Sequence, residues 1–366
     1  MSGALLLTGA TGFLGTELLA RHLERSDRPV VTLVRASSDA AARERIDGVL
    51  ANILGSGASR RAKQVDALAA DMSAPGLGVS HERRQELAKR VTTIIHSAAS
   101  VSFTMPLGEA REVNVEGTRR MLEFAALVQE QGGLDCYGHV STAYVAGTHA
   151  GRFAEGDLDV GQGFNNTYEQ TKYEAEQMVR AQQGLPFTIL RPSIVVGDRR
   201  SGWTSAFNVL YWPLRAFARG LFTEVPGNPA APLDVVSVDF VADAILELCS
   251  LGCGTGETFH LTAGPQASTI GELAQLASRY FRRPVPTLLS PAEFSQERRD
   301  ALEGSSAYFP YFAIGAVFDE AATRARLEPA GIRVSPLREY LERLLDFATR
   351  SRWGKRPITR VDAVAT

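Results

Sequence analysis

The sequence predicts an α/β protein: a Rossmann-type doubly wound parallel sheet followed by a smaller, mostly helical C-terminal lobe. Two observations predict this class. Across residues 1–200, short apolar runs alternate with longer amphipathic ones, as strands and helices do in βαβ units. A glycine-rich segment directly follows the first apolar run, which is where this fold carries one. The pattern becomes mixed after residue 200, so we expect a first domain at 1–200 and a second lobe at 201–366, partly interwoven with the first through residues 234–262.

Six apolar runs are strand candidates, and helical spacing fits between them. Leu14, Leu18 and Leu23 share one face of a predicted helix after the first run. Similar apolar stripes recur around residues 113–127 and 173–179. The strand candidates are residues 4–8, 30–34, 65–69, 93–96, 135–140 and 188–192.

Composition and charge exclude several classes of protein. The 366 residues include 39 Lys and Arg against 41 Asp and Glu, and this net charge of −2 gives no electrostatic footprint for nucleic acid or an anionic membrane. No run of 18 apolar residues occurs, so we expect no integral membrane segment. The N-terminus lacks the basic start of a secretory signal. We therefore expect a cytoplasmic protein.

Cysteine and histidine usage predicts neither a disulfide framework nor a metal site. Cys136, Cys249 and Cys253 are too few and too irregularly spaced for a disulfide framework, so we expect small, buried apolar residues in a reducing compartment. The six His residues show no metal-ligand spacing, and we expect His96 to be a strand residue.

The glycine-rich segment predicts dinucleotide binding. Gly9, Gly12 and Gly15 form a G-x-x-G-x-x-G pattern after the first predicted strand and at the start of a predicted helix. In this context the first glycine allows a tight turn, the second lets the backbone approach a pyrophosphate, and the third permits close packing of helix on sheet. The pyrophosphate is then expected at the positive N-terminus of the helix.

The end of the second predicted strand favours NADP(H) over NAD. An NAD-binding enzyme places Asp or Glu there to accept a hydrogen bond from the ribose 2′-hydroxyl. This strand ends in Arg35, and the first acid is Asp39. A guanidinium binds a 2′-phosphate through charge-assisted hydrogen bonds, whereas a carboxylate would repel it. Arg45, ten residues further, could contact the same phosphate, and a solvent-facing helix residue is the equal alternative.

A Y-x-x-x-K pattern supplies candidate catalytic residues. Tyr168 and Lys172 are four residues apart, so they lie on one face of a helix. We expect the Lys172 ammonium to lower the pKa of the Tyr168 phenol toward neutrality, so that Tyr168 exchanges a proton with a substrate oxygen. Lys172 can also bind the nicotinamide ribose. Thr142 follows the preceding strand candidate and is expected to hold the substrate carbonyl beside Tyr168.

Several segments carry a resemblance to a known family. Residues 7–15 (LTGATGFLG) and 33–36 (LVRA) are similar to the opening of terminal reductase domains of carboxylic acid reductases and nonribosomal peptide synthetases. Residues 166–172 (NTYEQTK) and 190–195 (LRPSIV) look closer to fatty acyl-CoA reductases. From about residue 4 to 345, the chain thus resembles the extended short-chain dehydrogenase/reductase superfamily, in its thioester reductase and fatty acyl-CoA reductase branch.

The resemblance implies further cofactor-binding residues. Arg45 falls where these reductase domains carry a second phosphate-binding arginine, and Asp71 with Met72 resembles their adenine-contacting pair. Residues 96–101 match the fourth-strand motif, and residues 114–118 the helix with a structural asparagine. The expected cofactor contacts are Gly9, Thr11, Gly12, Phe13, Leu14, Arg35, Arg45, Asp71, Met72, Ala98, Ala99, Asn114, Lys172, Pro192, Ser193 and Ile194.

The activity that the resemblance implies is NADPH-dependent reduction of an acyl thioester to an aldehyde, with further reduction to the alcohol left open. Hydride would add to the thioester carbonyl while Thr142 and Tyr168 stabilise the oxyanion. Tyr173 and Glu174 follow Lys172, where thioester reductases usually carry Trp. No adenylation or carrier domain precedes the motifs, so we expect the thioester in trans, on CoA or on a carrier protein.

Two other classes of function remain as alternatives. The same scaffold serves nucleotide-sugar epimerases and dehydratases, but dehydratases need an acid pair just after the active-site threonine, where this chain has Ala143 and Tyr144. Epimerases usually retain NAD, and Arg35 argues otherwise. A non-catalytic NADP sensor would need no proton-transfer pair such as Tyr168 and Lys172.

Candidate substrate-binding residues come from two aromatic stretches and one loop. Residues 207–222 have helical spacing and place Phe207, Tyr211 and Leu214 on one broad face. Core packing is the default reading of this face, and a wall for an acyl chain or pantetheine arm is the alternative. Ser100 is a further candidate beside the fourth strand. The aromatic run of Tyr308, Phe309, Tyr311 and Phe312 is the other candidate lining of the substrate entrance.

Overall fold

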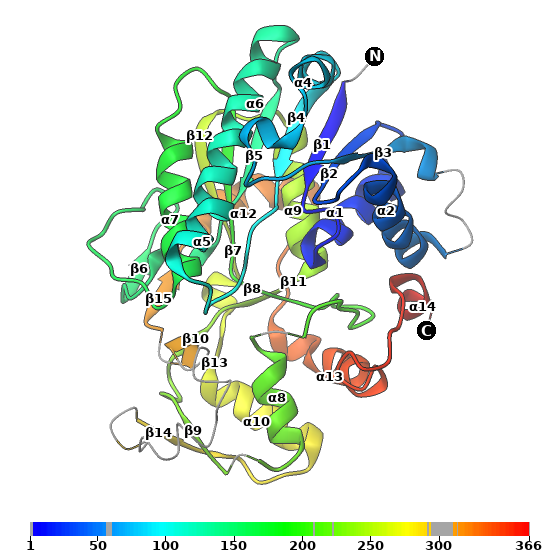
Figure 1. Cartoon of the computed structure of the whole chain (residues 1–366). Helices are drawn as coiled ribbons and strands as arrows, with labels where there is room; N and C mark the ends of the chain where they lie inside the picture. The colour runs from blue at the N-terminus through cyan, green and yellow to red at the C-terminus, as the bar shows by residue number, and fades with distance from the viewer. Residues whose placement is uncertain are drawn as a thin grey trace.

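A parallel sheet of seven strands forms the centre of the molecule in a computed structural model of the chain (Figure 1). The structure describes residues 3–55, 61–207, 209–221, 223–290, 293, 310–312 and 314–365. The strand order is β12-β7-β5-β4-β1-β2-β3, and every pairing in this sheet is parallel. The strands are β1 Ala4–Thr8, β2 Val30–Val34, β3 Val65–Ala69, β4 Val91–His96, β5 Cys136–Val140, β7 Phe187–Pro192 and β12 Thr255–Leu261.

The predicted fold class is confirmed, and the six predicted strands are present. The strands β1, β2 and β3 have the expected bounds, and the other three differ by one or two residues at their first residue. Apolar runs without alternation were a reliable signal here because a parallel sheet is covered on both faces. All five residues of β1, β2 and β5 are buried.

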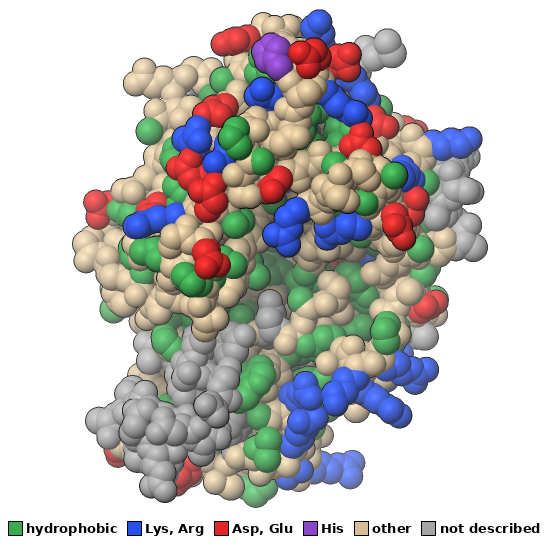
Figure 2. All heavy atoms as spheres, in the orientation of Figure 1, with side chains coloured by type: hydrophobic (Ala, Val, Ile, Leu, Met, Phe, Trp, Pro, Cys, Tyr) green, Lys and Arg blue, Asp and Glu red, His purple; other side chains and the backbone are tan. Residues whose placement is uncertain are grey.

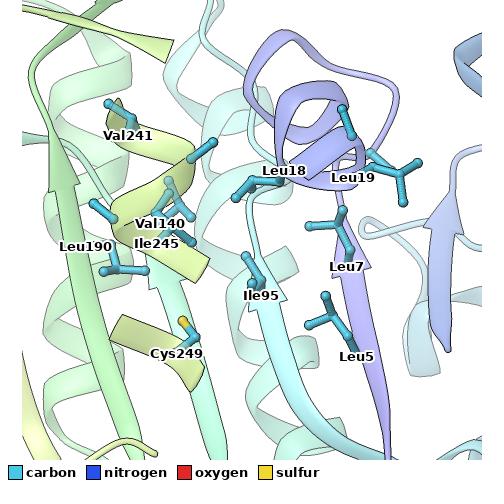
Figure 3. Close-up of a cluster of buried hydrophobic side chains, with 14 of the residues drawn as sticks. Leu5, Leu7, Leu18, Leu19, Ile95, Val140, Leu190, Val241, Ile245 and Cys249 are labelled. Carbon is cyan, nitrogen blue, oxygen red and sulfur yellow. The ribbon is translucent and has the colours of Figure 1, made fainter. Parts of the chain in front are cut away.

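Helices cover both faces of the sheet (Figure 1). On one face, Figure 3 shows Ile95 and Val140 of the sheet meeting Leu18 and Ile245 of two adjacent helices. The helices of this face are α1 Phe13–Arg25, α2 Asp39–Leu54 and α9 Val238–Ser250. The helices of the other face are α4 His81–Ala88, α6 Gly117–Gln131 and α7 Thr167–Arg180.

The strand order reverses between β1 and β4. From β1 the sheet continues through β2 to β3 at one edge, and from β4 it continues through β5 and β7 to β12 at the other. In open α/β sheets, ligands bind outside the carboxyl ends of the strands at such a switch point. The glycine-rich turn follows β1, and His96 ends β4. The topology therefore brings the predicted dinucleotide turn and the fourth-strand motif to one edge of the sheet.

A second hydrophobic core lies below the sheet in Figure 1, in a lobe of helices and short strand pairs. Its helices are α8 Tyr211–Ala218, α10 Ile270–Phe281 and α13 Leu341–Arg350. Its strand pairs are β8 Ile194–Val196 with β11 Val235–Ser237, β9 Glu224–Pro226 with β14 Thr287–Leu289, β10 Pro232–Leu233 with β13 Ser268–Thr269, and β6 Gly151–Phe153 with β15 Ala316–Phe318.

The two parts of the chain cross more than once. Along the chain, α9 and β12 come between elements of the lobe but belong to the sheet domain. Helix α9 packs beside α1, and β12 joins the large sheet next to β7. The C-terminal helix α14 (Arg360–Val364) returns to α1 and α2, where Arg360 bonds to Glu17, Glu24 and Asn52. The remaining helical elements are α5 Leu107–Arg111, the π-helical turn Glu112–Glu116, α12 Ala321–Leu327, and the 3₁₀ turns Ala62–Gln64, Pro75–Gly78, Ala143–Ala146, Gly264–Gln266, Glu328–Ala330 and Leu337–Glu339.

The helix expected over residues 207–222 is shorter than predicted. Helix α8 covers only Tyr211–Ala218. Val209 has a φ of 29°, which a helix cannot contain, and Gly220 has a φ of 74°, the left-handed conformation that commonly ends a helix. Phe222 lies outside the described residues.

The expectation that all three cysteines are unpaired was wrong. Cys136 and Cys253 form a disulfide, with their Cα atoms 4.8 Å apart. Cys136 is the first residue of β5, and the chain after α9 returns to it, with the Cys253 N–H donating to the Asp135 carbonyl. The 117-residue separation hides this pairing in the sequence. Cys249, in the last turn of α9, is buried and free, as expected (Figure 3).

No helix among the described residues is both long enough and apolar enough to cross a membrane.

Candidate active site

The glycine-rich turn leaves the N-terminus of α1 open. Gly9 has a φ of 76°, and a Cβ atom on Gly15 would lie 2.0 Å from the Gly9 carbonyl oxygen, so a side chain at either position is incompatible with this turn. Gly12 caps α1 without any side-chain hydrogen bond. The first N–H groups of a 13-residue helix are thus available to an anion, which is what a pyrophosphate requires.

Two arginines meet beside this turn. The Arg45 guanidinium donates to the Arg35 carbonyl and to the Thr11 hydroxyl, the latter at 3.3 Å, so Arg45 bridges the end of β2 and the turn. Asp39, the first acid after β2, is engaged elsewhere: it accepts from the Ala69 N–H at 2.8 Å and pairs with Arg83 at 2.9 Å. The region therefore presents two cations, with the Asp39 carboxylate engaged elsewhere, and it fits a 2′-phosphate.

The loop after β3 is held against α6. Asp71 accepts hydrogen bonds from the Ser73 N–H and hydroxyl, which lower the pKa of its carboxyl, with smaller lowering contributions from Arg35 and Arg120. The Met72 carbonyl accepts from the Arg120 guanidinium at 2.7 Å. Asp71 thus lies within electrostatic reach of Arg35, and its adenine contact stays a prediction.

A buried hydrogen-bond chain joins β1 to the loop that follows β4. The Thr8 hydroxyl oxygen accepts from the backbone N–H groups of Ser97 and Ala98 at 3.1 and 3.0 Å, and it lies 2.9 Å from His96 Nδ1. His96 Nε2 lies 3.3 Å from the Thr118 hydroxyl. Burial, with the charge of Lys172 as a second cause, lowers the pKa of His96 to about 3, so the ring is neutral. The network fixes the loop of Ala98 and Ala99 beside the dinucleotide turn.

Asn114 joins this loop to the helix of the predicted catalytic pair. It lies in the π-helical turn Glu112–Glu116 and is buried. Its side-chain oxygen accepts from the Ser100 N–H at 2.8 Å, and its amide donates to the Ser100 carbonyl and the Thr171 hydroxyl, both at 3.0 Å. Asn114 therefore has a structural position, as the resemblance implied, and a direct cofactor contact stays a prediction.

The structure brings Thr142 and Tyr168 together. Thr142 follows β5, and Tyr168 lies in the first turn of α7, where the Asn166 side chain caps the helix by accepting from the Glu169 N–H. The Thr142 hydroxyl lies close enough to the Tyr168 hydroxyl to influence its pKa, and it donates to the Pro192 carbonyl at 3.3 Å. Two hydroxyl groups from different elements thus converge at one point.

The expected effect of Lys172 on Tyr168 was wrong. Burial raises the pKa of the Tyr168 hydroxyl to about 12; the Thr142 hydrogen bond opposes this rise, and the charge of Glu169 adds to it. The Lys172 ammonium is buried and donates to the Val140 carbonyl at 2.8 Å, and burial lowers its pKa to about 8 against the attraction of Glu176. Because burial raises its pKa, Tyr168 keeps its proton at neutral pH. That is the protonation state that a proton donor in a reduction requires.

Comparison with known proteins assigns the family. The model of the male sterility protein family (NAD_binding_4) matches residues 7–245. The chain belongs to this family. It is 33% identical over 275 residues to the nonribosomal peptide synthetase asaC of Aspergillus flavus, which is 71% of this chain and 26% of that protein. It is 30% identical over 275 residues to the fatty acyl-CoA reductase wat of Drosophila melanogaster, which is 66% of this chain and 52% of that protein.

A solved relative extends the likeness over nearly the whole chain. The terminal R domain from the myxalamid PKS-NRPS biosynthetic pathway superposes with a TM-score of 0.81 at 26% identity, covering 98% of this chain and 94% of that one. Against the two curated relatives, in contrast, the chain spans between about a quarter and a half of their length.

Sequence reasoning missed a buried ion pair behind α7, the helix that carries Tyr168 and Lys172. The side chains of Glu176 and Arg191 are both fully buried and lie 2.6 Å apart. Glu176 also accepts from the Ser141 hydroxyl at 2.7 Å and attracts the Lys172 charge. The four-residue spacing of Lys172 and Glu176 on one helix face was the available signal. The partner on β7 could not be paired with it without the fold.

A second missed residue, Glu169, connects α7 to the lobe. Its buried carboxylate accepts from the Tyr311 hydroxyl at 2.7 Å, and burial raises its pKa, opposed by hydrogen bonds from Asn165 and Tyr311. The Phe103 ring stacks on Tyr311 with centroids 5.2 Å apart and lies 6.0 Å from the Tyr168 ring. Tyr311, from the predicted aromatic entrance, thus lies next to the candidate site. Tyr308 and Phe309 lie outside the described residues.

The other predicted substrate residues lie mostly in packed surroundings. The Tyr211 ring is buried, and its hydroxyl accepts from the Gly197 N–H at 2.9 Å. Leu214 is 4% exposed and, with Phe312, lines a narrow apolar cavity of about 60 Å³. Phe207 is half-buried, with its ring parallel to Phe347 at 6.3 Å. A contact of these residues with substrate stays a prediction.

No group of His, Cys, Asp or Glu side chains among the described residues could hold a metal ion.

Proposed function

We propose that the chain is an NADPH-dependent reductase of acyl thioesters with Thr142, Tyr168 and Lys172 in the catalytic roles. The single observation that carries this proposal is the Thr142–Tyr168 hydroxyl pair, with a protonated Tyr168, at the switch-point edge of the sheet. Membership of a family with acyl-CoA reductases and peptide synthetases supports the substrate class. Ala143 and Tyr144, both buried after Thr142, leave no acid pair for dehydratase chemistry.

NADP(H) is the proposed cofactor because the residues present fit its two charged groups. The open N-terminus of α1 suits the pyrophosphate, and Arg35 with Arg45 suits the 2′-phosphate. When bound, the cofactor supplies the hydride. The remaining chemistry belongs to the chain.

In the proposed mechanism, the hydroxyls of Thr142 and Tyr168 donate to the thioester carbonyl oxygen and polarise it. As the carbonyl carbon accepts hydride, negative charge develops on this oxygen, and the two donors stabilise it. Tyr168 transfers its proton to the oxygen, which gives a hemithioacetal. Breaking the C–S bond of the hemithioacetal then releases an aldehyde and a thiol, and a second round at the aldehyde carbonyl would give the alcohol.

Lys172 orients this arrangement through its buried charge. Its ammonium is fixed on the Val140 carbonyl, between β5 and α7, and Glu176 favours its charged form. We propose that it also donates to the nicotinamide ribose. The Glu176–Arg191 pair lies behind it and keeps α7 in register with β7.

The test is a substrate panel read by NADPH oxidation and product identification. We expect turnover of octanoyl-N-acetylcysteamine and octanoyl-CoA with octanal as the first product, and no turnover of UDP-sugars. Tyr168→Phe should lose at least about 100-fold in kcat/KM with NADPH binding intact, because only the proton donor is removed. Tyr173→Phe, five residues along the same helix, is the matched control. Equal activity of Tyr168→Phe and Tyr173→Phe, or no thioester turnover, would refute the proposal.

A further inference from the structure

The C-terminal part of the lobe carries a concentration of positive charge. Residues 350–360 (RSRWGKRPITR) contain five cations and no carboxylate. Helix α8 adds Arg215, and its C-cap residue is Arg219. Figure 2 shows Lys and Arg side chains gathered over the part of the lobe where Figure 1 draws α8 and α13, with no acidic side chain among them in this view. Five of the cations in residues 350–360 and at α8 are called the basic rim below: Arg215, Arg219, Arg352, Lys355 and Arg356.

The basic rim is not neutralised from within the chain. Elsewhere, guanidinium groups pair with carboxylates, as Arg111 does with Glu174 and Arg90 with Asp66. Over the residues that the structure describes, no carboxylate lies within ion-pair distance of the five rim cations. The chain as a whole has a net charge of −2, so this positive field is local. An uncompensated local field attracts anionic partners and raises their rate of encounter.

The backbone of the turn that carries Arg352, Lys355 and Arg356 is constrained. Arg352, Trp353 and Gly354 have φ values of 51°, 57° and 84°, three consecutive left-handed residues, of which two are not glycine. Such strain persists only where surrounding contacts impose it, and it concentrates at functional sites. Here the Trp353 ring packs against the core of the lobe, and a Cβ atom on Gly354 would lie 2.9 Å from the Phe207 ring. The cations of this segment are therefore exposed on a constrained turn rather than on a free tail.

The same segment leads from the lobe to the dinucleotide turn. The Ile358 carbonyl accepts from the Trp203 indole N–H at 3.3 Å. The Trp203 ring lies 6.1 Å from the ring of Phe13, the first residue of α1, directly after Gly12 of the turn. Figure 2 shows a recess with hydrophobic side chains between the sheet domain and the lobe, and the gathered cations lie on the lobe side of it. A partner seated on the rim is thus next to the edge of the molecule that carries the candidate active site.

We propose that the basic rim is the docking surface for an acidic carrier protein that presents the acyl thioester on its phosphopantetheine arm. This inference rests on the proposed function and selects the carrier-bound form of the thioester. The rim cations are distributed over two elements and are exposed, apart from the half-buried Arg215. A single phosphate is bound best by donors that converge on it, whereas a distributed array complements a protein surface with several carboxylates.

The test compares one acyl group on three leaving groups. The probes are octanoyl thioesters of an acidic acyl carrier protein of bacterial fatty acid synthesis, of CoA, and of neutral N-acetylcysteamine. The variant is the triple substitution Arg352→Gln, Lys355→Gln and Arg356→Gln. We expect kcat/KM for the carrier thioester to fall by at least about 10-fold, mainly through KM, and the N-acetylcysteamine thioester to stay within about twofold.

A matched control removes the same charge from the opposite edge of the sheet domain, through Lys63→Gln, Lys89→Gln and Arg90→Gln, and should leave all three thioesters unchanged. In the unmodified enzyme, KM for the carrier thioester should rise steeply with salt up to ~0.3 M, and the rim variant should lose this dependence.

The outcomes separate the two proposals. A rim variant that loses only CoA-thioester activity, that loses all three equally, or that keeps full carrier activity overturns the docking surface. If the unmodified enzyme reduces the N-acetylcysteamine thioester in any of these cases, the proposed function stands by itself. If it reduces no thioester at all, the proposed function fails, and the docking surface fails with it.

Discussion

At the scale of single residues, burial rather than a neighbouring charge decides the protonation of the candidate site. Tyr168 has its pKa raised to about 12, and Lys172 has its pKa lowered to about 8, and in both groups desolvation is the largest cause. Near neutrality the phenol is thereby held protonated, whereas the amine is close to its titration point. A reduction that consumes one proton from Tyr168 fits the first of these states.

The first prediction concerns pH. If the charged form of Lys172 is the active one, kcat/KM should be constant up to about pH 8 and fall above it, since this quantity reports the free enzyme. Lys172→Arg should move the fall to higher pH, because a guanidinium does not titrate there. A profile that stays level to pH 9.5 in the unmodified enzyme would contradict this role.

The same shift has a consequence for stability with a definite sign. The folded pKa of about 8 is below the unfolded value, so between pH 8 and about 10.4 the unfolded chain binds more protons at this residue. The contribution of Lys172 to the free energy of unfolding should therefore rise with pH over this range, while activity falls. Denaturant melts at several pH values measure the free energy of unfolding. Between pH 8 and about 10.4, this free energy should increase more with pH in the unmodified protein than in Lys172→Met.

The second prediction concerns the choice of cofactor. Arg35→Asp should weaken NADPH binding by about 10- to 100-fold, as expected from the ~1.5–3 kcal/mol of a hydrogen bond to a charged group, and NADH binding should change much less. Arg333→Asp changes the charge equally at an exposed position of the lobe and should leave both affinities alone. Fluorescence titration of each cofactor measures the result, and equal use of both cofactors by the unmodified protein would count against the two-arginine site.

At the scale of elements, α8 distinguishes a core helix from a substrate wall. Its apolar face is formed by residues such as Tyr211, Leu214 and Phe217, which belong to the buried core of the lobe. The cavity beside Leu214 is lined mainly by residues of α8 and α10 and measures only about 60 Å³. It is too small for a pantetheine arm in this conformation, so packing is the stronger reading of this face.

The third prediction follows from that packing. Leu214→Asp should lower the melting temperature strongly, because it places an unpaired charge in an apolar site at a cost of several kcal/mol. Leu221→Asp, three residues beyond the end of α8 at a side chain that is 66% exposed, is the matched control and should melt like the unmodified protein. A folded, stable Leu214→Asp protein with a raised KM for the thioester would instead make this face part of the substrate site.

At the scale of the whole molecule, the C-terminal segment closes the chain onto its first helix. Arg360 of α14 bonds to the buried Glu17 at 2.7 Å and to Glu24 at 2.7 Å, although it is 343 residues from Glu17. This contact anchors the far end of the segment that carries the basic rim. The lobe is thus attached to the sheet domain at both the α9–β12 crossing and the C-terminus.

The fourth prediction tests this closure. Arg360→Ala should destabilise the protein by up to about 3–5 kcal/mol, the cost of breaking a buried ion pair, and less to the extent that Arg21 keeps Glu17 paired. Arg326→Ala breaks an exposed pair with Glu257 and should cost less than ~1 kcal/mol. Urea unfolding of both variants measures the difference, and equal midpoints would show that α14 contributes little to the closure.

The sequence by itself determined the fold class, the bounds of most strands and the identity of the chemical motifs. It could do so because these signals are local. Apolar runs mark strands that are buried on both faces, and glycines at 9, 12 and 15 mark a tight turn that admits no side chain at positions 9 and 15. A four-residue spacing places Tyr168 and Lys172 on one helix face. Such patterns depend on neighbouring residues alone.

Only the tertiary structure decided which distant residues meet. The Cys136–Cys253 disulfide, the Glu176–Arg191 pair and the Glu169–Tyr311 hydrogen bond each join residues from different elements, so no spacing along the chain reveals them. The protonation of Tyr168 was misjudged for the same reason: it depends on desolvation and on where the Lys172 amine points, and both are set by packing of α7 against β5. Charge and hydrogen-bond energies depend on distance and burial, and these exist only once the chain is folded.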